Sequence, residues 1–295
     1  MIYINKKVLM SDARYFTNKN AINALMNSKD KVNQIKAIKE HDSIVKALRQ
    51  VGIEVMKVPS PTNCQDGVYV ANWAFILDGK ALLSRLPNTR RPEELYANKV
   101  LKQFNLKIIN MPQNIKSFSG QGDTLVCGDY IFCQSPYRTS INAHQELKRL
   151  FPDKKIISLQ TKPKRKFWIG PKKINKITGW PDSRTYDLDL ALAVLKPKIN
   201  NKNCLIAYSL TLFTRKSKKL LKSLKDVDKI KVSKKEAIKY YALNLVSTGE
   251  HVILNSGTTK FIKSLKEHGL KTTELDLPEL RKGGGSIRCT TLTLK

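Results

Sequence analysis

The residues best suited to covalent chemistry lie near the C-terminus, where Cys289 follows three glycines and the tripeptide Ser-Ile-Arg. Glycine has no Cβ, so the backbone at 283–285 can come close to a bound ligand. A cysteine is a strong nucleophile once its thiol has lost its proton. The segment 283–289 therefore predicts a nucleophilic thiol, presented at the start of a short apolar strand.

Acidic residues recur in three other segments, namely 64–73 with Asp66, 119–123 with Asp123, and 186–189 with Asp187 and Asp189. Carboxylates beside a thiol raise its pKa and hinder formation of the thiolate. They suit a cationic ligand instead, because a carboxylate accepts two parallel hydrogen bonds from a guanidinium group. Taken singly, each aspartate is equally typical of a turn or of the start of a strand.

A repeated unit of strand, turn, strand, helix and strand predicts how these segments are positioned. Helices are predicted from apolar residues three and four apart, and strands from short β-branched runs bounded by Gly, Asp or Asn. The strand–strand–helix–strand sets fall at 69–77, 80–85, 92–104 and 106–110; at 124–127, 130–134, 142–150 and 155–159; at 188–195, 203–209, 217–224 and 229–232; and at 242–247, 251–255, 258–268 and 272–277.

The ends of the chain supply a fifth unit, from the opening strand 7–10, the helix 34–51, the strand 54–58 and the C-terminal strand. Repeats of one supersecondary unit are typical of arrays and propellers. Because the last strand completes the first unit, we predict a closed ring: one α/β domain over residues 1–295 with fivefold pseudosymmetry. The unit starts, and Cys289, would then face the central axis. The segment 161–185 is predicted to be a long loop.

Composition excludes several classes of protein. A hydrophobic fraction of 41% fits a globular chain. No apolar run reaches the roughly 20 residues that span a bilayer, and no secretory signal is recognisable, so we expect a cytoplasmic protein without a membrane partner. Five cysteines without a CxxC pair fit a reducing compartment and argue against disulfides and a zinc site. No metal or cofactor is expected.

The net charge of +30 is extreme and would attract polyanions without a specific site. The lysines are dispersed, as a genome rich in A and T would produce, so non-specific contact with nucleic acid is the expected consequence. The stretch 162–173 is the one basic run interleaved with aromatic residues, Phe167 and Trp168. A solvated loop is the simpler interpretation, and an RNA-binding loop is the alternative.

These motifs, in their order along nearly the whole chain, resemble the pentein superfamily of guanidino-group-modifying proteins. The branch that the chain resembles contains amidinotransferases and dimethylarginine dimethylaminohydrolases. The resemblance is carried by Cys289 with its glycines, and by Gln65-Asp66, Asn72-Trp73, Ser84-Arg85, Arg90-Arg91, Gly120-Gln121-Gly122-Asp123 and Leu188-Asp189. It implies a fivefold α/β propeller, the fold that the repeats predict.

The resemblance also implies roles for single residues. Cys289 matches the nucleophile that attacks the guanidinium carbon of arginine or a methylated arginine. Asp66 and Asp189 match carboxylates that hold the guanidinium, and Arg85 matches an arginine that meets the substrate carboxylate. Asn72 and Asp123 belong to the same substrate-binding motifs.

Two positions depart from the family pattern. The histidine that acts as general acid and base is replaced by Asp187, and the acidic residue that orients it is replaced by Ser119. An aspartate, with an unperturbed pKa near 3.9, is poorly suited to give a proton to a leaving amine at neutral pH. The four histidines, His41, His144, His251 and His268, fall on or beside predicted outer helices or at a strand start, and we expect ordinary surface residues.

The sequence thus predicts an amidinotransferase- or dimethylaminohydrolase-like protein that binds a guanidino ligand and is catalytically impaired at Asp187 and Ser119. Two alternatives stay open. One is an active guanidino hydrolase or amidinotransferase in which another group replaces the missing base. The other is a non-catalytic basic propeller that binds RNA or the ribosome, a use that the superfamily also contains.

Overall fold

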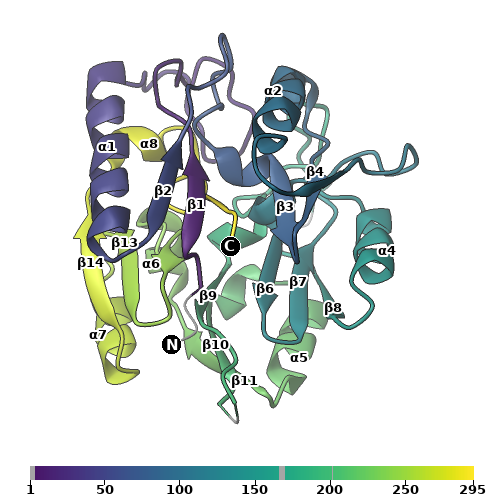
Figure 1. Cartoon of the computed structure of the whole chain (residues 1–295), viewed down its shortest axis with the longest axis vertical. Coiled ribbons are helices and arrows are strands. Elements are labelled where there is room, and N and C mark those ends of the chain that lie inside the picture. The colour runs from purple at the N-terminus through teal and green to yellow at the C-terminus, as the bar shows by residue number, and fades with distance from the viewer. Residues whose placement is uncertain (1–3, 166–169, 201) are drawn as a thin grey trace.

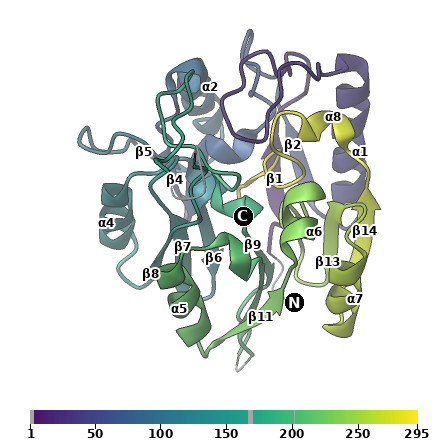
Figure 2. The same cartoon turned by 180° about the vertical axis from the view of Figure 1, so that it is seen from behind.

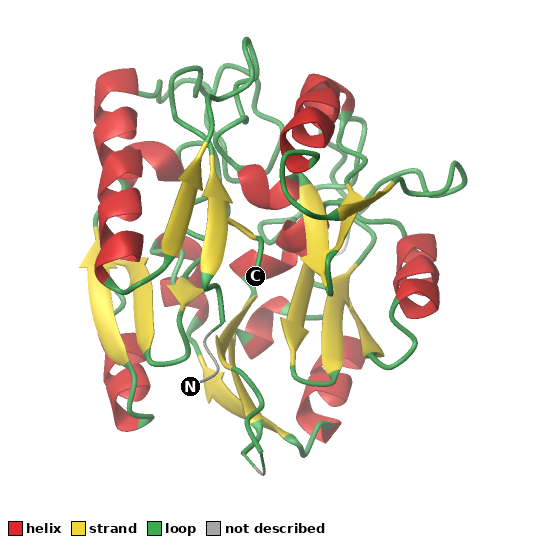
Figure 3. Ribbon diagram, viewed as in Figure 1, coloured by secondary structure: helices red, strands yellow, loops and turns green. Residues whose placement is uncertain are grey.

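The computed structural model describes residues 4–165, 170–200 and 202–295. These residues form five separate three-stranded sheets, with strands inside and helices outside (Figures 1 and 3). The strands of the five sheets, in spatial order, are β15 (Leu292–Thr293), β1 (Lys7–Met10) and β2 (Glu54–Lys57); β3 (Ala74–Leu77), β4 (Lys80–Leu83) and β5 (Lys107–Ile109); β6 (Thr124–Cys127), β7 (Tyr130–Gln134) and β8 (Lys155–Leu159); β9 (Leu192–Lys196), β10 (Cys204–Tyr208) and β11 (Val227–Lys231); and β12 (Val246–Ser247), β13 (His251–Asn255) and β14 (Lys271–Leu275).

Each sheet has the same internal design. The first two strands are antiparallel, and the third is parallel to the second after a crossover through a helix. The crossover helices are α1 (Gln34–Gln50), α2 (Arg91–Leu101), α4 (Ile141–Leu150), α5 (Arg215–Ser223) and α7 (Thr259–Glu267). A parallel pair needs such a crossover, whereas an antiparallel pair needs only a short turn. The predicted ββαβ repeat therefore describes the chain correctly, and the helices surround the sheets in both views (Figures 1 and 2).

The two ends of the chain meet in one sheet. Val8 pairs with Thr293 and Leu9 with Leu292, so the last strand completes the first unit as predicted. This pairing closes the ring and carries the preceding loop, with Cys289, to the centre of the molecule. Cys289 itself lies before β15 and not at its start, because the strand is only two residues long.

Three units begin with short helical turns, two of which replace predicted strand residues at 70–72 and 188–190. They are η1 (Val70–Asn72), α3 (Gly120–Asp123) and η3 (Leu188–Leu190), which precede β3, β6 and β9. The turn α3 contacts both η1 and η3. The turns gather the polar side chains of three units into one place. The predicted strand 242–247 also shrinks to β12, because Tyr241 adopts a positive φ of 52° and the next residues turn.

Four further helical segments were not predicted. The short helices are α6 (Lys234–Lys239), visible from behind in Figure 2, α8 (Pro278–Arg281), η2 (Asn88–Arg90) and η4 (Leu210–Leu212). No helix among the described residues is long and apolar enough to cross a membrane. The aromatic residues Phe167 and Trp168 of the basic stretch lie outside the described residues.

Two histidines are not surface residues, which corrects the expectation. His41 and His144 are 1% and 4% exposed, because the faces of α1 and α4 that carry them pack inward. Burial lowers the pKa of His41 to about 4. His144 hydrogen-bonds Ser158 Oγ and the carbonyl of Gln134 through its two ring nitrogens, so it is fixed by neighbours on β7 and β8.

The cysteines also differ from the expectation, since Cys127 and Cys204 form a disulfide. An odd count without CxxC spacing does not exclude a single pair that neighbouring sheets bring together. Cys127 ends β6 and Cys204 begins β10, and their Cα atoms lie 5.9 Å apart. The bond therefore joins two units that are 77 residues apart in sequence.

We predict that the denatured, unreduced chain exposes three alkylatable thiols, those of Cys64, Cys133 and Cys289. Reduction should raise the number to five, the total in the sequence. It should also lower the free energy of unfolding by about 2–4 kcal/mol, because the cross-link restrains the unfolded chain. Mass spectrometry after alkylation counts the thiols, and five labels without reductant would contradict the pairing.

Candidate active site

The thiol of Cys289 is held by two side chains from other units. Asn244 Nδ2 donates to the sulfur at 3.1 Å, and Sγ lies 3.3 Å from Asp189 Oδ2. Asn244 Oδ1 also accepts from the backbone N–H groups of Ser286 and Cys289, at 3.0 and 3.2 Å. One asparagine thus shapes the glycine-rich loop and orients the thiol. No role was predicted for Asn244 from the sequence.

Asp187, which the resemblance places at the position of a catalytic histidine, is buried, and each of its oxygens accepts a hydrogen bond. Ser119 Oγ donates to its Oδ1 at 3.0 Å, and Asn72 Nδ2 donates to its Oδ2 at 2.8 Å. Asn72 Nδ2 also reaches Ser119 Oγ at 2.9 Å. The two residues that depart from the pattern implied by the resemblance are therefore direct hydrogen-bond partners.

The turn that carries Ser119 packs against this pair with little room. A Cβ on Gly122 would lie 2.8 Å from Asp187 Oδ2 and would also clash with Asn72 Nδ2. On the opposite side, Gly284 has a positive φ of 87°, and an added Cβ would meet the amide of Asn23. Both glycines are required by close approach of other chain segments to the site.

Asp66 lies on the same side of the molecule as Cys289 and is 2% exposed. Gln65 Nε2 donates to its Oδ2 at 2.8 Å, and Arg90 Nη2 donates to its backbone carbonyl at 3.2 Å. Burial raises the pKa of Asp66 to about 6, against the lowering effect of the Arg90 guanidinium. The carboxyl group is therefore poised to ionise when a cation arrives.

Arg90 connects this region to the core. Its guanidinium forms a buried ion pair with Glu93, at 2.7 Å, and donates to Asn72 Oδ1 at 2.8 Å. Trp73 Nε1 donates to the Glu93 carboxylate at 3.1 Å. Arg90 was recognised in a motif without a role, and the structure shows that it orients Asn72, the partner of Asp187.

Asp123 is completely buried and lines no cavity near the thiol. Its carboxylate accepts from Thr139 Oγ1 at 2.7 Å, from Leu188 N–H at 3.0 Å and from Gln134 Nε2 at 3.2 Å. These bonds fasten the start of η3, which carries Asp189. The contacts fit a positioning role, and direct ligand contact by Asp123 stays a prediction.

Two arginines line the site from opposite walls. Arg85 was predicted from the sequence, and its guanidinium donates to the backbone carbonyls of Met111 and Gln113. Arg138, which no motif indicated, lies 5.1 Å from the ring centroid of Tyr186 and 5.6 Å from that of Trp180. Its guanidinium also donates to the carbonyl of Ile22. Arg138 is thus a second cation in place for a ligand carboxylate.

The void beside the thiol is nearly closed. Its volume is about 20 Å³, room for one water molecule. It is lined by the loop 22–23, by residues of the unit starts and by Cys289, and the lining includes Asp66, Asn72, Arg85, Ser119, Arg138 and Asp187. Asn23 Nδ2 bonds the carbonyl of Gly283 at 3.0 Å, so the loop 22–23 is fastened over the thiol. An arginine-sized ligand requires this loop to move.

Electrostatics keep the thiol protonated in this state. Burial raises the pKa of Cys289 well above its ordinary value, and the carboxyl groups of Asp189 and Asp187 raise it further. Burial and the neighbouring Asp187 also raise the pKa of Asp189 to about 8. A guanidinium placed among these groups would lower all three pKa values, because a nearby positive charge favours thiolate and carboxylate. Within 4–165, 170–200 and 202–295, no three His, Cys, Asp or Glu side chains are arranged to hold a metal ion.

Comparison with known proteins identifies the family. The family model described as N,N dimethylarginine dimethylhydrolase, eukaryotic, matches residues 10–161, about half of the chain. The N(G),N(G)-dimethylarginine dimethylaminohydrolase of Mycobacterium tuberculosis is 27% identical over 98% of this chain and 86% of its own length. The bifunctional arginine dihydrolase/ornithine cyclodeaminase AgrE of a Nostoc species is 24% identical over 89% of this chain and 34% of its own length.

Solved structures show the same fold. The substrate-bound N-terminal domain of ArgZ, a cyanobacterial arginine dihydrolase, superposes with a TM-score of 0.83 at 21% identity and covers 98% of both chains. A dimethylarginine dimethylaminohydrolase adduct superposes with a TM-score of 0.70 at 16% identity. The fivefold α/β propeller predicted from the repeats is thereby confirmed. The chain belongs to the N,N-dimethylarginine dimethylhydrolase family, within the pentein superfamily.

Proposed function

We propose that this protein binds arginine or a methylated arginine at the buried site beside Cys289, and that it turns this ligand over very slowly or not at all. One observation supports the proposal that turnover is very slow or absent. Both oxygens of Asp187, at the position of the family histidine, already accept hydrogen bonds from Ser119 and Asn72. Burial raises the pKa of Asp187, and these two hydrogen bonds oppose that rise by favouring the carboxylate form, which has no proton to give to a leaving amine.

The binding part is supported by the charges of the site. Asp66 and Asp189 flank the thiol region with carboxyl groups whose pKa values are raised by burial, so a bound cation would stabilise their ionised forms. Arg85 and Arg138 stand on the walls, where a ligand carboxylate would be stabilised. A ligand with a guanidinium at one end and a carboxylate at the other satisfies both sets. AgrE has been solved with L-arginine, which agrees with this choice.

The hydrolytic chemistry assigned to Cys289 follows from the family. Attack of a thiolate on the guanidinium carbon forms a tetrahedral adduct, and its collapse expels an amine that must take up a proton. Water must then be deprotonated to release the ureido product. Within the described residues, no histidine bonds the Cys289 sulfur, whose partners are Asn244 and Asp189. The substitute base of the alternative hypothesis therefore has no histidine in place.

We predict that arginine affinity rises with pH across the titration of Asp66. Below the pKa of about 6, Asp66 is mainly protonated and must release its proton to bind a cation. Because Asp189, with a pKa of about 8, must also ionise, the affinity should fall by roughly tenfold for each pH unit below 8 and by roughly a further tenfold for each unit below 6. Titration calorimetry between pH 5 and 7.5 measures this dependence.

The Asp66→Asn variant provides the control, because it keeps the shape of the side chain and removes its titration. Its arginine affinity should be weaker at pH 7.5 and should lose the steeper fall below pH 6, keeping only the dependence that Asp189 causes. An affinity without pH dependence in the unmodified protein would exclude Asp66 as the guanidinium carboxylate. Absence of arginine binding at every pH would contradict the proposed function itself.

A further inference from the structure

A second cavity, of about 670 Å³, lies on the other side of Asp189 from the thiol. It opens between the turns at Asp78–Gly79 and Gly128, and its lining shares no residue with the void beside Cys289. Volumes of this size are typical of sites for small organic ligands. The cavity is more than thirty times larger than the void on the catalytic side, so the two spaces cannot serve the same ligand in this state.

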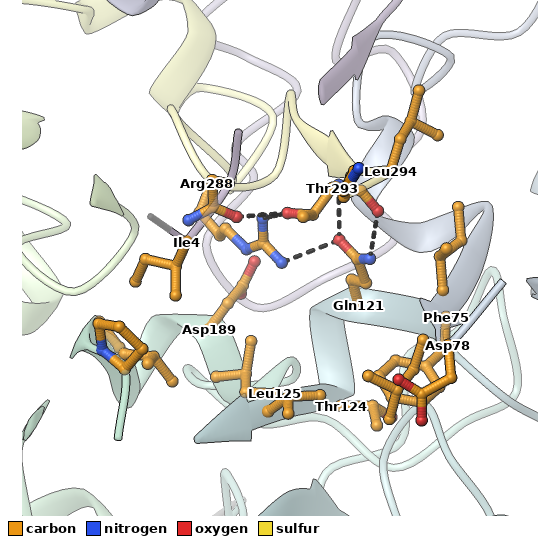
Figure 4. Close-up of a pocket in the computed structure, with 18 of the residues that line it drawn as sticks. Ile4, Phe75, Asp78, Gln121, Thr124, Leu125, Asp189, Arg288, Thr293 and Leu294 are labelled. Carbon is orange, nitrogen blue, oxygen red and sulfur yellow. Dashed lines mark hydrogen bonds between the residues drawn. The ribbon is translucent and has the colours of Figure 1, made fainter. Parts of the chain in front are cut away.

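The walls of this cavity are mainly apolar and its inner end is polar. The apolar wall comprises Phe75, Leu125, Leu192, Leu243 and Leu245. Figure 4 shows Arg288, Gln121 and Asp189 converging at the inner end, with Leu125, Phe75 and Leu294 around them. A predominantly apolar pocket with a few convergent polar groups is the usual form of a ligand site.

The guanidinium of Arg288 is only partly used by the protein. It donates to Thr293 Oγ1 at 3.0 Å and to Gln121 Oε1 at 2.9 Å, which engages two of its five N–H groups (Figure 4). No ion pair joins it to a carboxylate of the described residues. A positive charge lining an apolar cavity without a counter-charge is costly, so it favours an anionic ligand.

Asp189 provides the second, independent observation. Its side chain is 1% exposed, and Oδ1 is buried without a hydrogen-bond partner among the described residues, whereas Oδ2 contacts the thiol. A buried unpaired polar atom is destabilising and calls for an explanation. In Figure 4 the Asp189 side chain extends toward Arg288, between the cavity wall and the guanidinium.

We propose that this cavity binds a small amphipathic monocarboxylate, with its apolar body against the apolar wall and its carboxylate between Arg288 and Asp189. The cavity, Arg288 and the apolar wall support this site separately from the function proposed for the thiol side, with which it shares Asp189. Arg288 supplies charge and free N–H donors to the carboxylate. Burial raises the pKa of Asp189 to about 8, so its unpartnered oxygen carries a proton at neutral pH and donates as well. A cationic head group would instead be repelled by Arg288.

Titration calorimetry with octanoate, acetate and octylamine at pH 7 and physiological salt tests the proposal. Octanoate should bind at one site per chain, about 100-fold more tightly than acetate because the cavity buries its alkyl chain. Octylamine, with the same chain and the opposite charge, should bind at least tenfold more weakly. Equal binding of octanoate and octylamine, or no binding of octanoate, would overturn the proposal.

The Val194→Trp variant distinguishes the cavity from the basic surface. Val194 is a half-buried residue of β9 that lines the cavity and is not one of the polar residues proposed to bind the carboxylate, so an indole there should occupy part of the cavity. Octanoate affinity should fall at least tenfold. Thr272→Trp, at a half-buried position of β14 outside the cavity, should leave it unchanged. The melting temperatures of both variants show whether they fold, and undiminished binding by a folded Val194→Trp chain would place octanoate on surface lysines and refute the site.

Discussion

The unmodified protein should release no measurable citrulline from arginine or from methylated arginine, even at high enzyme concentration. The reason lies in proton transfer and not in the nucleophile. General acid–base catalysis by a positioned side chain contributes about 100- to 10,000-fold to a rate. Asp187 is poorly suited to provide it, because the hydrogen bonds from Ser119 and Asn72 favour its carboxylate form, which has no proton to give. Burial and the nearby carboxyl groups further suppress the thiolate of Cys289.

Replacing both departing residues should restore the reaction. The double variant Asp187→His, Ser119→Glu reinstates an imidazole and the carboxylate that orients it, and we expect citrulline release to rise by about 100-fold or more. Asp187→His alone should gain much less, because Ser119 offers a hydroxyl in place of the orienting charge. A coupled colorimetric assay for citrulline follows all three proteins.

Two controls make this result interpretable. Adding Cys289→Ser to the double variant should abolish the restored activity, which shows that it arises at this thiol. Arginine affinity of the single and double variants, measured by calorimetry, separates a failure to bind from a failure to react. Rapid turnover by the unmodified chain would refute the impaired-enzyme proposal and would direct attention to a base outside the histidine position.

The fold was predictable because each repeat has local sequence patterns that are typical of its turn, helix and strands. Each ββαβ unit has a turn such as Asp78–Gly79, a helix with apolar residues three and four apart, and a short strand on either side. The first residues of the units were harder to predict, since η1 and η3 were predicted to be strand and the turn α3 was not predicted. Their helical turns are set by contacts with other units, including the bonds that Asp123 makes to Thr139 and Leu188. Contacts between residues far apart in the chain cannot be predicted from the local sequence.

Site residues were predictable only where they belong to a motif that resembles the family. Asp66, Asn72, Ser119, Asp187 and Cys289 line one void, as their positions at unit starts suggested. Arg138 was missed because a single arginine in 135–140 has no neighbours of recognisable spacing, and its role arises from stacking near Trp180 and Tyr186. The disulfide was missed for the same reason, since two cysteines 77 residues apart pair only after their sheets meet.

The Glu93→Gln variant should be strongly destabilised, by about 3–5 kcal/mol in the free energy of unfolding. The substitution keeps the shape of the side chain but removes the charge that neutralises Arg90. Both side chains of the pair are buried, at 7% and 1% exposure. Arg90 would remain a buried cation, its other partners being Asn72 Oδ1 and the carbonyls of Asp66 and Tyr69. Urea unfolding monitored by circular dichroism measures the loss.

Glu146→Gln is the matched control, because Glu146 also pairs with an arginine three residues away, at the same distance of 2.7 Å. There the Arg149 side chain is 67% exposed, so water replaces the lost partner and the unfolding free energy should barely change. The contrast isolates burial as the cause, since the pairing geometry is alike. A small effect at Glu93 would show that Arg90 is hydrated or mobile in the native protein. Arg90 could not then orient Asn72 toward Asp187. The hydrogen bond from Asn72 to Asp187, on which the proposed loss of activity partly rests, would lose its structural support.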